Sequence, residues 1–268
     1  MNGVPSFPNL AAGMGRDVLR YARLDLEEIE PLHIRGRTRA IEHLRGPHGN
    51  IRAGALLTML DTAGGICGGL AALPEGWVVS TNMSACTVRT DQTGPLRVDG
   101  RVVRKGRNNV VTAVQIFDDA DGALVVDGVL TSAILVPEHG PPQWERPLRL
   151  SMPDPDDGYQ PMDEWLGLRE ADPGTIEIDV RDGLRNPWGI LHGGVVASLV
   201  DAAAVHVTGG GVTSDVVLHY LAPNRTGPVR ARAAVLGTRS DGTVVRVEVR
   251  DEGAARATAV AVATVADR

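Results

Sequence analysis

The chain has 268 residues and a formal net charge of -6 at pH 7; 43% of its residues are hydrophobic and 3% are aromatic. This length allows one large domain or two ordinary ones, each able to bury its own core, which aliphatic side chains must fill. The acidic balance argues against a chain that is drawn as a whole to polyanions, so we expect no nucleic-acid or membrane partner. An anionic ligand would need a local basic patch.

The N-terminal 28 residues lack the basic flank and apolar run of a secretory signal, which favours a cytoplasmic protein. The two cysteines, Cys67 and Cys86, are too few for a disulfide framework and lack metal-type spacing. We expect both to be small core residues in a reducing compartment.

Two apolar runs stand out, at residues 53–73 and 193–205, and each holds one aspartate and several glycines. Neither has enough uninterrupted hydrocarbon for a membrane span. A helix that is apolar on nearly all sides is enclosed by other elements. The runs therefore predict two buried central helices.

The two runs belong to an internal repeat. GNIRAGALLTMLD, which ends at Asp61, aligns without a gap with GILHGGVVASLVD, which ends at Asp201. Residues 80–95 then align with residues 213–228, and alternating segments typical of antiparallel strands follow each copy. Each half thus reads as a helix followed by about four strands, an α+β unit whose antiparallel sheet wraps a long central helix. We expect the two helices to pack side by side and the two sheets to join.

The halves divide at a segment rich in proline, aspartate and glycine. We predict an N-terminal repeat over residues 1–140, a linker over 141–160 and a C-terminal repeat over 161–268. The C-terminal repeat opens with a short helical turn near residue 165 and a strand at 175–180.

The C-terminal half resembles the hotdog-fold acyl-CoA thioesterases of the phenylacetate-degradation (PaaI-like) type. The family pattern is an asparagine, five residues, His-Gly-Gly, an acid on the central helix and a hydroxyl residue on the next strand. Six residues meet it: Asn186, His192, Gly193, Gly194, Asp201 and Thr213. The first half is similar more faintly, so the resemblance implies a tandem, or double, hotdog.

In the single-hotdog relatives, two subunits pair, and each site takes its Asn, His and Gly from one chain and its acid and hydroxyl from the other. His192 and Asp201 fit this division, because nine residues of helix separate them by roughly 13 Å. One composite site is complete: Asn186, His192 and Gly193 with Asp61 and Ser80. The other is degenerate, since Gly46, Arg52 and Ala53 stand opposite Asp201 and Thr213. There we expect Asp201 to pair with Arg52.

Thioester hydrolysis needs a polarised carbonyl, an activated water and a stabilised oxyanion. The backbone N–H of Gly193, at a helix N-terminus, would bind the oxyanion. Asn186 or His192 would add a polar contact or hold the loop. Asp61 would act as general base or, less favoured, as nucleophile, and Ser80 would position the water.

Substrate binding is predicted at Gly194 and at the basic turn Arg104, Lys105 and Arg107, which would meet coenzyme A phosphates; Arg225 and Arg230 form a second basic group. The substrate would be an acyl-CoA or acyl-carrier thioester. No cofactor is expected beyond coenzyme A as part of that substrate, and a homodimer is expected.

Two alternatives stay open. One is a non-catalytic acyl-CoA-binding or regulatory hotdog protein. The other is an enoyl-thioester hydratase, for which Asp201 and His206 have the required spacing, although within a helix.

Overall fold

The computed structural model describes residues 16–267 except 40, 47–48, 93, 138–139, 142–144, 152–153 and 155–157. The expectation about the N-terminal segment therefore lies largely outside the described residues, as does part of the predicted linker.

The described part of the first half contains, in this order, α1 (Arg16–Ala22), β1 (Leu24–Glu30), β2 (His33–Thr38), the 3-10 turn η2 (Glu42–Leu44), α2 (Ala53–Ala72), β3 (Trp77–Thr87), β4 (Leu96–Lys105), β5 (Asn109–Asp118), β6 (Leu124–Leu135) and β7 (Arg149–Leu150). The second half follows the same plan: α3 (Met162–Leu166), β8 (Arg169–Asp172), β9 (Thr175–Ile178), η3 (Asp182–Leu184), α4 (Gly193–Val207), β10 (Val212–Tyr220), β11 (Val229–Arg239), β12 (Gly242–Asp251) and β13 (Arg256–Ala266). The central helices α2 and α4, the short helix α3 and the long strands lie where the sequence patterns predict them, whereas α1 and β8 were not predicted. The β1–β2 hairpin was not predicted, and the short β7 lies inside the predicted linker, paired with β1.

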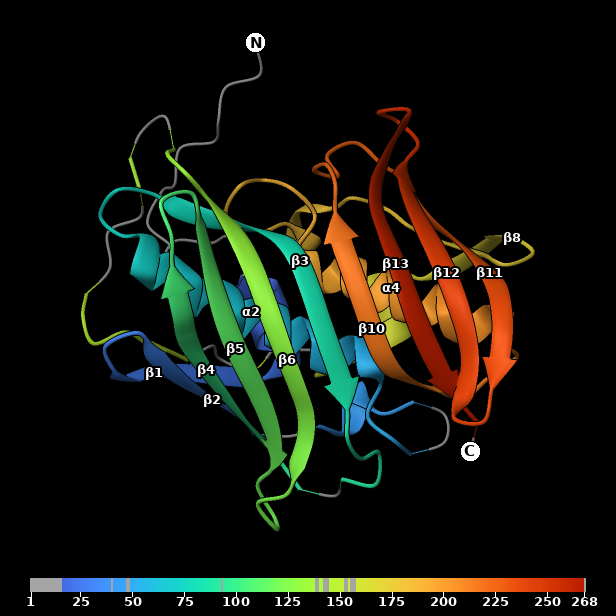
Figure 1. Ribbon diagram of the computed structural model, residues 1–268, viewed down its shortest axis with the longest axis horizontal. Helices are drawn as coiled ribbons and strands as arrows, with labels where there is room; N and C mark the ends of the chain where they lie inside the picture. The colour runs from blue at the N-terminus through green and yellow to red at the C-terminus, as the bar shows by residue number, and fades with distance from the viewer. Residues whose placement is uncertain are drawn as a thin grey trace.

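All the strands form one sheet in the order β7-β1-β2-β4-β5-β6-β3-β10-β13-β12-β11-β9-β8. The halves join where β3 pairs antiparallel with β10, from Asn82 opposite His219 to Cys86 opposite Asp215. Figure 1 shows the sheet curving around α2 and α4, which lie next to each other behind it. The predictions of a continuous sheet and of side-by-side helices are confirmed.

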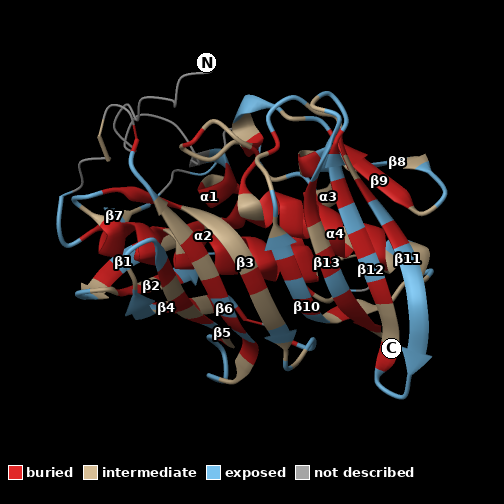
Figure 2. Cartoon of the chain, turned by 45° about the horizontal axis from the view of Figure 1, so that its top comes forward, coloured by how far each residue is buried: buried red, intermediate tan, exposed pale blue. Residues whose placement is uncertain are grey.

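The core lies between the sheet and the two helices. Strand residues that face the helices are buried and alternate with more exposed residues on the opposite face (Figure 2), as the period of two predicted. By length and composition α2 could cross a membrane, but 94% of its most apolar window is buried inside the protein. The expectation for the cysteines is correct for Cys67, which is buried, and wrong for Cys86, which lies on the exposed face of β3.

Two aligned glycines let the central helices touch through their backbones. A Cβ on Gly54 would lie 2.9 Å from Cα of Ser198, and one on Gly194 would lie 2.6 Å from Cα of Thr58. The two hydroxyls meet at the crossing, with Thr58 Oγ1 3.0 Å from Ser198 Oγ. Because the helices are antiparallel at this crossing, the N-terminus of each reaches the aspartate of the other.

Candidate active site

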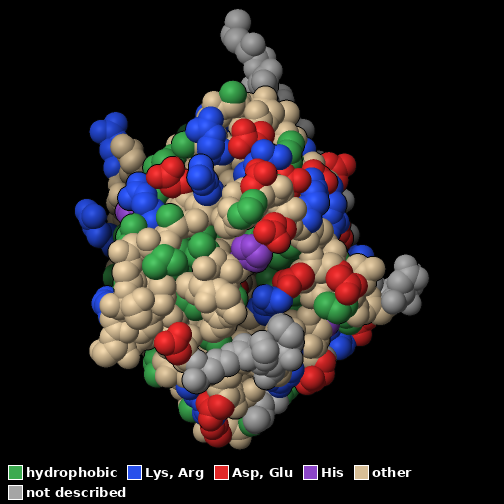
Figure 3. Space-filling model, turned by 90° about the vertical axis from the view of Figure 1, so that its right-hand side faces the viewer, with side chains coloured by type: hydrophobic (Ala, Val, Ile, Leu, Met, Phe, Trp, Pro, Cys, Tyr) green, Lys and Arg blue, Asp and Glu red, His purple; other side chains and the backbone are tan. Residues whose placement is uncertain are grey.

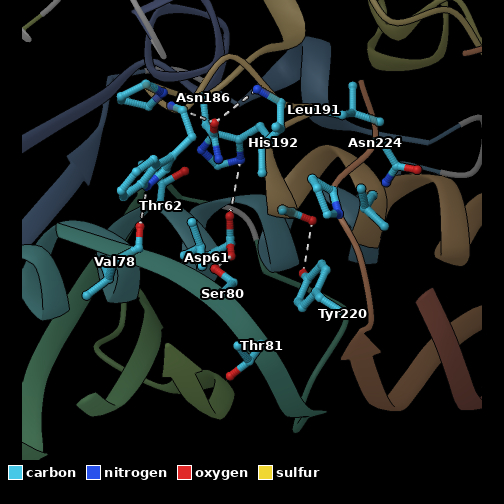
Figure 4. Close-up of a pocket in the computed structure, with 18 of the residues that line it drawn as sticks. Asp61, Thr62, Val78, Ser80, Thr81, Asn186, Leu191, His192, Tyr220 and Asn224 are labelled. Atoms are coloured by element: carbon cyan, nitrogen blue, oxygen red, sulfur yellow. Dashed lines mark hydrogen bonds and ion pairs between the residues drawn. The ribbon is translucent and has the colours of Figure 1, made fainter. Parts of the chain in front are cut away.

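A cavity of about 310 Å³ lies where the two halves meet. Its walls come from α2, from β3, from the loop before α4 and from the loop after β10. The sequence-predicted residues Asp61, Ser80, Asn186, His192 and Gly193 all line it. Figure 4 shows Asp61 and Ser80 pointing toward His192 from the other half.

The Asp61 carboxylate accepts hydrogen bonds from both halves. Its Oδ1 accepts from the Ser80 hydroxyl at 2.6 Å, and its Oδ2 accepts from the Gly194 N–H at 2.8 Å. The side chain is only 5% exposed. The positive end of α4 compensates a carboxylate buried in this way. The hydrogen bond from the Gly194 N–H therefore explains how an acid is accommodated in the otherwise apolar helix α2.

The first two residues of α4, Gly193 and Gly194, are glycines that each come close to a neighbouring group, and the group differs between them. A Cβ on Gly193 would lie 2.7 Å from Oδ1 of Asp61, so only glycine lets the carboxylate come this close. The Tyr220 hydroxyl donates to the Gly193 carbonyl at 3.0 Å, while Asp61 accepts from Gly194. The peptide between the two glycines is thus fixed at both ends. The N–H of Gly193 itself has no acceptor within its own helix, because it is in the first turn.

His192 caps α4 and contacts the same carboxylate. Its Nδ1 lies 3.1 Å from the Gly194 nitrogen and 3.2 Å from Oδ2 of Asp61. Burial lowers the pKa of His192, against the opposing effect of Asp61, so the ring is neutral near pH 7. A hydrogen on Nε2 leaves Nδ1 to accept from Gly194, whereas a hydrogen on Nδ1 donates to Asp61.

Asn186 shapes the loop that leads to His192. Its Oδ1 accepts from the backbone N–H of Trp188 at 2.9 Å and of Ile190 at 3.4 Å. The Trp188 indole in turn donates to the carbonyl of Val78 on β3 at 2.7 Å. Of the two roles predicted for Asn186, its contacts correspond to holding the loop.

The corresponding contacts recur around Asp201. Its Oδ2 accepts from the Gly54 N–H at 2.9 Å and its Oδ1 from the Thr213 hydroxyl at 2.5 Å. Burial raises the pKa of Asp201, although these hydrogen bonds and the charge of Arg52 oppose the effect. A second cavity, of about 630 Å³, lies beside it.

The predicted pair between Asp201 and Arg52 is wrong. Arg52 bonds instead with Asp163 of α3, because both Asp201 oxygens already have donors and Asp163 lies in a half-exposed place that the guanidinium reaches without full desolvation. His206 also lines this cavity, and its Nε2 lies 3.3 Å from Glu170. The molecule is shown from the side of β8 and β11 in Figure 3, where acidic, basic and histidine side chains lie close together.

The predicted phosphate-binding turn lies outside the lining of the first cavity. Arg104 and Lys105 end β4, Arg107 follows in the exposed turn, and Lys105 lies 3.3 Å from Glu75. The N–H of Ile134, the neighbour of the cavity-lining Leu135, donates to the Asn108 carbonyl at 2.9 Å and ties this turn to the end of β6. Of the second basic group, Arg225 lines the cavity and is exposed, while Arg230 bonds to Glu177 at 2.7 Å.

Sequence reasoning missed Tyr220, Trp188 and Asn224, which all line the first cavity. A signal was available for two of them. In the gap-free alignment of residues 80–95 with 213–228, Tyr220 stands opposite Thr87 and Asn224 opposite Asp91. Like Asn186, His192 and Gly193, these two residues therefore have no counterpart of the same type in the first half. Among the residues that the structure describes, no group of three His, Cys, Asp or Glu side chains could hold a metal ion.

This chain is similar to known thioesterases in sequence over part of its second half and in structure over both halves. Residues 189–258 match the family model of the thioesterase superfamily. No curated protein matches the sequence. The 12:0-ACP thioesterase from Umbellularia californica is similar in structure, with 13% identity over 87% of this chain and 93% of its own and a TM-score of 0.61. A tesB protein from Mycobacterium avium subspecies paratuberculosis has 14% identity, coverage of 94% and 98% and a TM-score of 0.60. An acyl-ACP thioesterase from Bacteroides thetaiotaomicron has 13% identity, coverage of 87% and 97% and a TM-score of 0.58. At these identities the likeness establishes the fold, which is the hotdog fold of thioesterases.

Proposed function

We propose that this protein hydrolyses acyl thioesters at one composite site, in which Asp61 and Ser80 from the first half face His192 and Gly193 from the second. One observation carries the proposal. A buried carboxylate lies against the first turn of the opposite helix, with a hydroxyl and a neutral imidazole in contact and an apolar cavity beside it. The match to the thioesterase superfamily and the structural neighbours named as thioesterases support a thioester hydrolase.

The chain is, in this proposal, a tandem double hotdog of the PaaI-like type. The repeat around Asp61 and Asp201, and the matching contacts of the two aspartates, support two related units. Single chains of the structural neighbours also align over both halves.

The mechanism follows from the placement of these groups. The thioester carbonyl oxygen lies toward the Gly193 N–H, which stabilises the negative charge that develops as the tetrahedral intermediate forms. Asp61 takes a proton from a water that Ser80 helps to position, and the water oxygen bonds to the carbonyl carbon. The carbonyl then re-forms as the carbon–sulfur bond breaks, and the departing thiolate takes the proton that Asp61 holds, which restores the Asp61 carboxylate. In a single turnover in labelled water this route puts the label into the product acid alone, whereas label in the Asp61 carboxylate would reveal a mixed anhydride that water opens at the Asp61 carbonyl carbon.

The substrate is an acyl-CoA or an acyl-carrier thioester, and coenzyme A enters only as part of it. The test is thiol release from a panel of short, long and aromatic acyl-CoAs. Release from at least one acyl-CoA is expected. If no thiol is released while the acyl-CoAs still bind, the protein is the non-catalytic binding module instead.

We also propose a cytoplasmic homodimer. Exposed valines lie in one row across the outer face of the sheet, where Val129 and Val217 both neighbour Ser84 and Val262 neighbours Val217. A second copy would cover this row. Light scattering that finds only 28 kDa species would contradict the dimer.

A further inference from the structure

Asn224 places a buried carboxamide oxygen, Oδ1, in the cavity wall, and this oxygen has no hydrogen-bond partner among the described residues. The residue lies in the loop between β10 and β11, is 4% exposed and lines the first cavity. Buried polar atoms are almost always paired, because an unpaired one costs about 1–3 kcal/mol. An unpaired carboxamide oxygen in the wall of a cavity therefore points to a ligand that donates a hydrogen bond.

The loop does not need this side chain for its own conformation. The Asn224 carbonyl accepts from the Leu191 N–H at 3.0 Å, which joins the loop to the segment before α4. Asp251 accepts from the N–H groups of Arg225, Thr226 and Gly227 at 2.8, 3.1 and 2.9 Å. The backbone is thus held from two sides, and the carboxamide remains available.

The position of Asn224 indicates which part of a substrate passes it. The lining of the cavity includes the buried apolar residues Leu19 and Ile66. It also includes Leu221 and Arg225, which are exposed and belong to the same loop as Asn224, so Asn224 lies in the part of the wall that reaches solvent. Figure 4 shows Asn224 apart from Asp61 and Ser80. An acyl chain belongs in the apolar end, and a thiol arm ending in phosphate must leave toward solvent.

On the basis of the proposed function, we infer that Asn224 recognises an amide of the substrate's thiol arm. The pantetheine arm that carries acyl groups in coenzyme A and in carrier proteins contains two secondary amides. Each offers one N–H and one carbonyl, and a carboxamide complements both through Oδ1 and Nδ2. Asn224 is in this view a binding residue that selects pantetheine thioesters over simple ones. The first half has no equivalent, since Asp91 at the aligned position is exposed and bonds with Arg89.

The test compares two thioesters of one acyl group, on N-acetylcysteamine, which has one amide, and on ethanethiol, which has none. Asn224→Leu should lower kcat/KM about tenfold for the first, the loss of one well-placed hydrogen bond, and leave the second unchanged. Asp91→Leu, the matched control in the other half, should change neither. An equal loss on both thioesters, or no loss on either, would overturn the inference.

A binding measurement separates this inference from the proposed function. Calorimetry with pantetheine should show a Kd about tenfold weaker for Asn224→Leu, whether or not the protein hydrolyses thioesters. Wild type that releases no thiol from the acyl-CoA panel would refute the hydrolase, and the pantetheine Kd would then decide the role of Asn224 alone. An unchanged pantetheine Kd in Asn224→Leu would overturn the inference that Asn224 binds an amide of the thiol arm. Asn224→Ala gives a second variant, and both should melt no lower than wild type, because the replaced oxygen is unpaired.

Discussion

Replacing Asp61 by asparagine should remove most of the activity while the fold persists. The carboxylate accepts two hydrogen bonds, at 2.6 Å from Ser80 and 2.8 Å from Gly194. An asparagine can keep the second through Oδ1 and donate to the Ser80 oxygen through Nδ2, so the protein loses only the charge-assisted part, about 1 kcal/mol. It cannot take a proton from water. The loss of a positioned general base lowers kcat by about 10²–10⁴-fold, which is roughly 3–5 kcal/mol.

The chain provides the matched control. Asp201 is buried in the same way and accepts from Gly54 at 2.9 Å and Thr213 at 2.5 Å, so Asp201→Asn changes the same chemistry at the aligned position. It should keep most of the activity, because Arg52 and Ala53 stand there instead of His192 and Gly193. Thiol release measures kcat, and thermal denaturation shows whether both variants fold.

Two results would refute this reasoning. An inactive Asp201→Asn with an active Asp61→Asn would place the reaction in the second cavity. Equal partial losses in the two variants would mean that both composite sites work, and the site at Arg52 would not be degenerate.

Three further predictions concern the same region. Gly194→Ala should cost about 1–3 kcal/mol in the free energy of unfolding, because its Cβ would lie 2.6 Å from the backbone of α2, whereas Gly65→Ala, with nothing within 4 Å, should be neutral or stabilising in thermal denaturation. Tyr220→Phe should lower kcat up to about tenfold with little change in KM, since it frees the Gly193 carbonyl; an unchanged kcat would show that this hydrogen bond does not position the site. The folded-state pKa of His192 lies below its unfolded value of about 6.5, so its contribution to stability is present above that pH and is lost as the pH falls below it. Denaturant unfolding at several pH values should show a shallower loss in His192→Gln, and identical slopes would contradict the burial argument.

The sequence alone was sufficient for the central helices, the long strands and five members of the candidate site. Helix and strand periodicity is local, so the apolar runs and the alternating segments predicted those elements directly. The gap-free repeat added non-local information, because aligned positions in two copies imply equivalent places in two folded units. The resemblance to the single-hotdog thioesterases, applied to the two copies, implied that Asp61 meets His192 although they are 131 positions apart in the chain.

Only the tertiary structure showed which side chains from segments far apart in the sequence contact one another. Arg52 bonds to Asp163 and not to Asp201 because α3, which opens the second repeat, lies beside the N-terminal part of α2. Tyr220 reached Gly193, and Asn224 became part of the cavity wall, only because the loops around α4 fold onto each other. Such contacts depend on how closely two helices cross, which the Cβ-free positions Gly54 and Gly194 set, and no pattern along the chain encodes that distance.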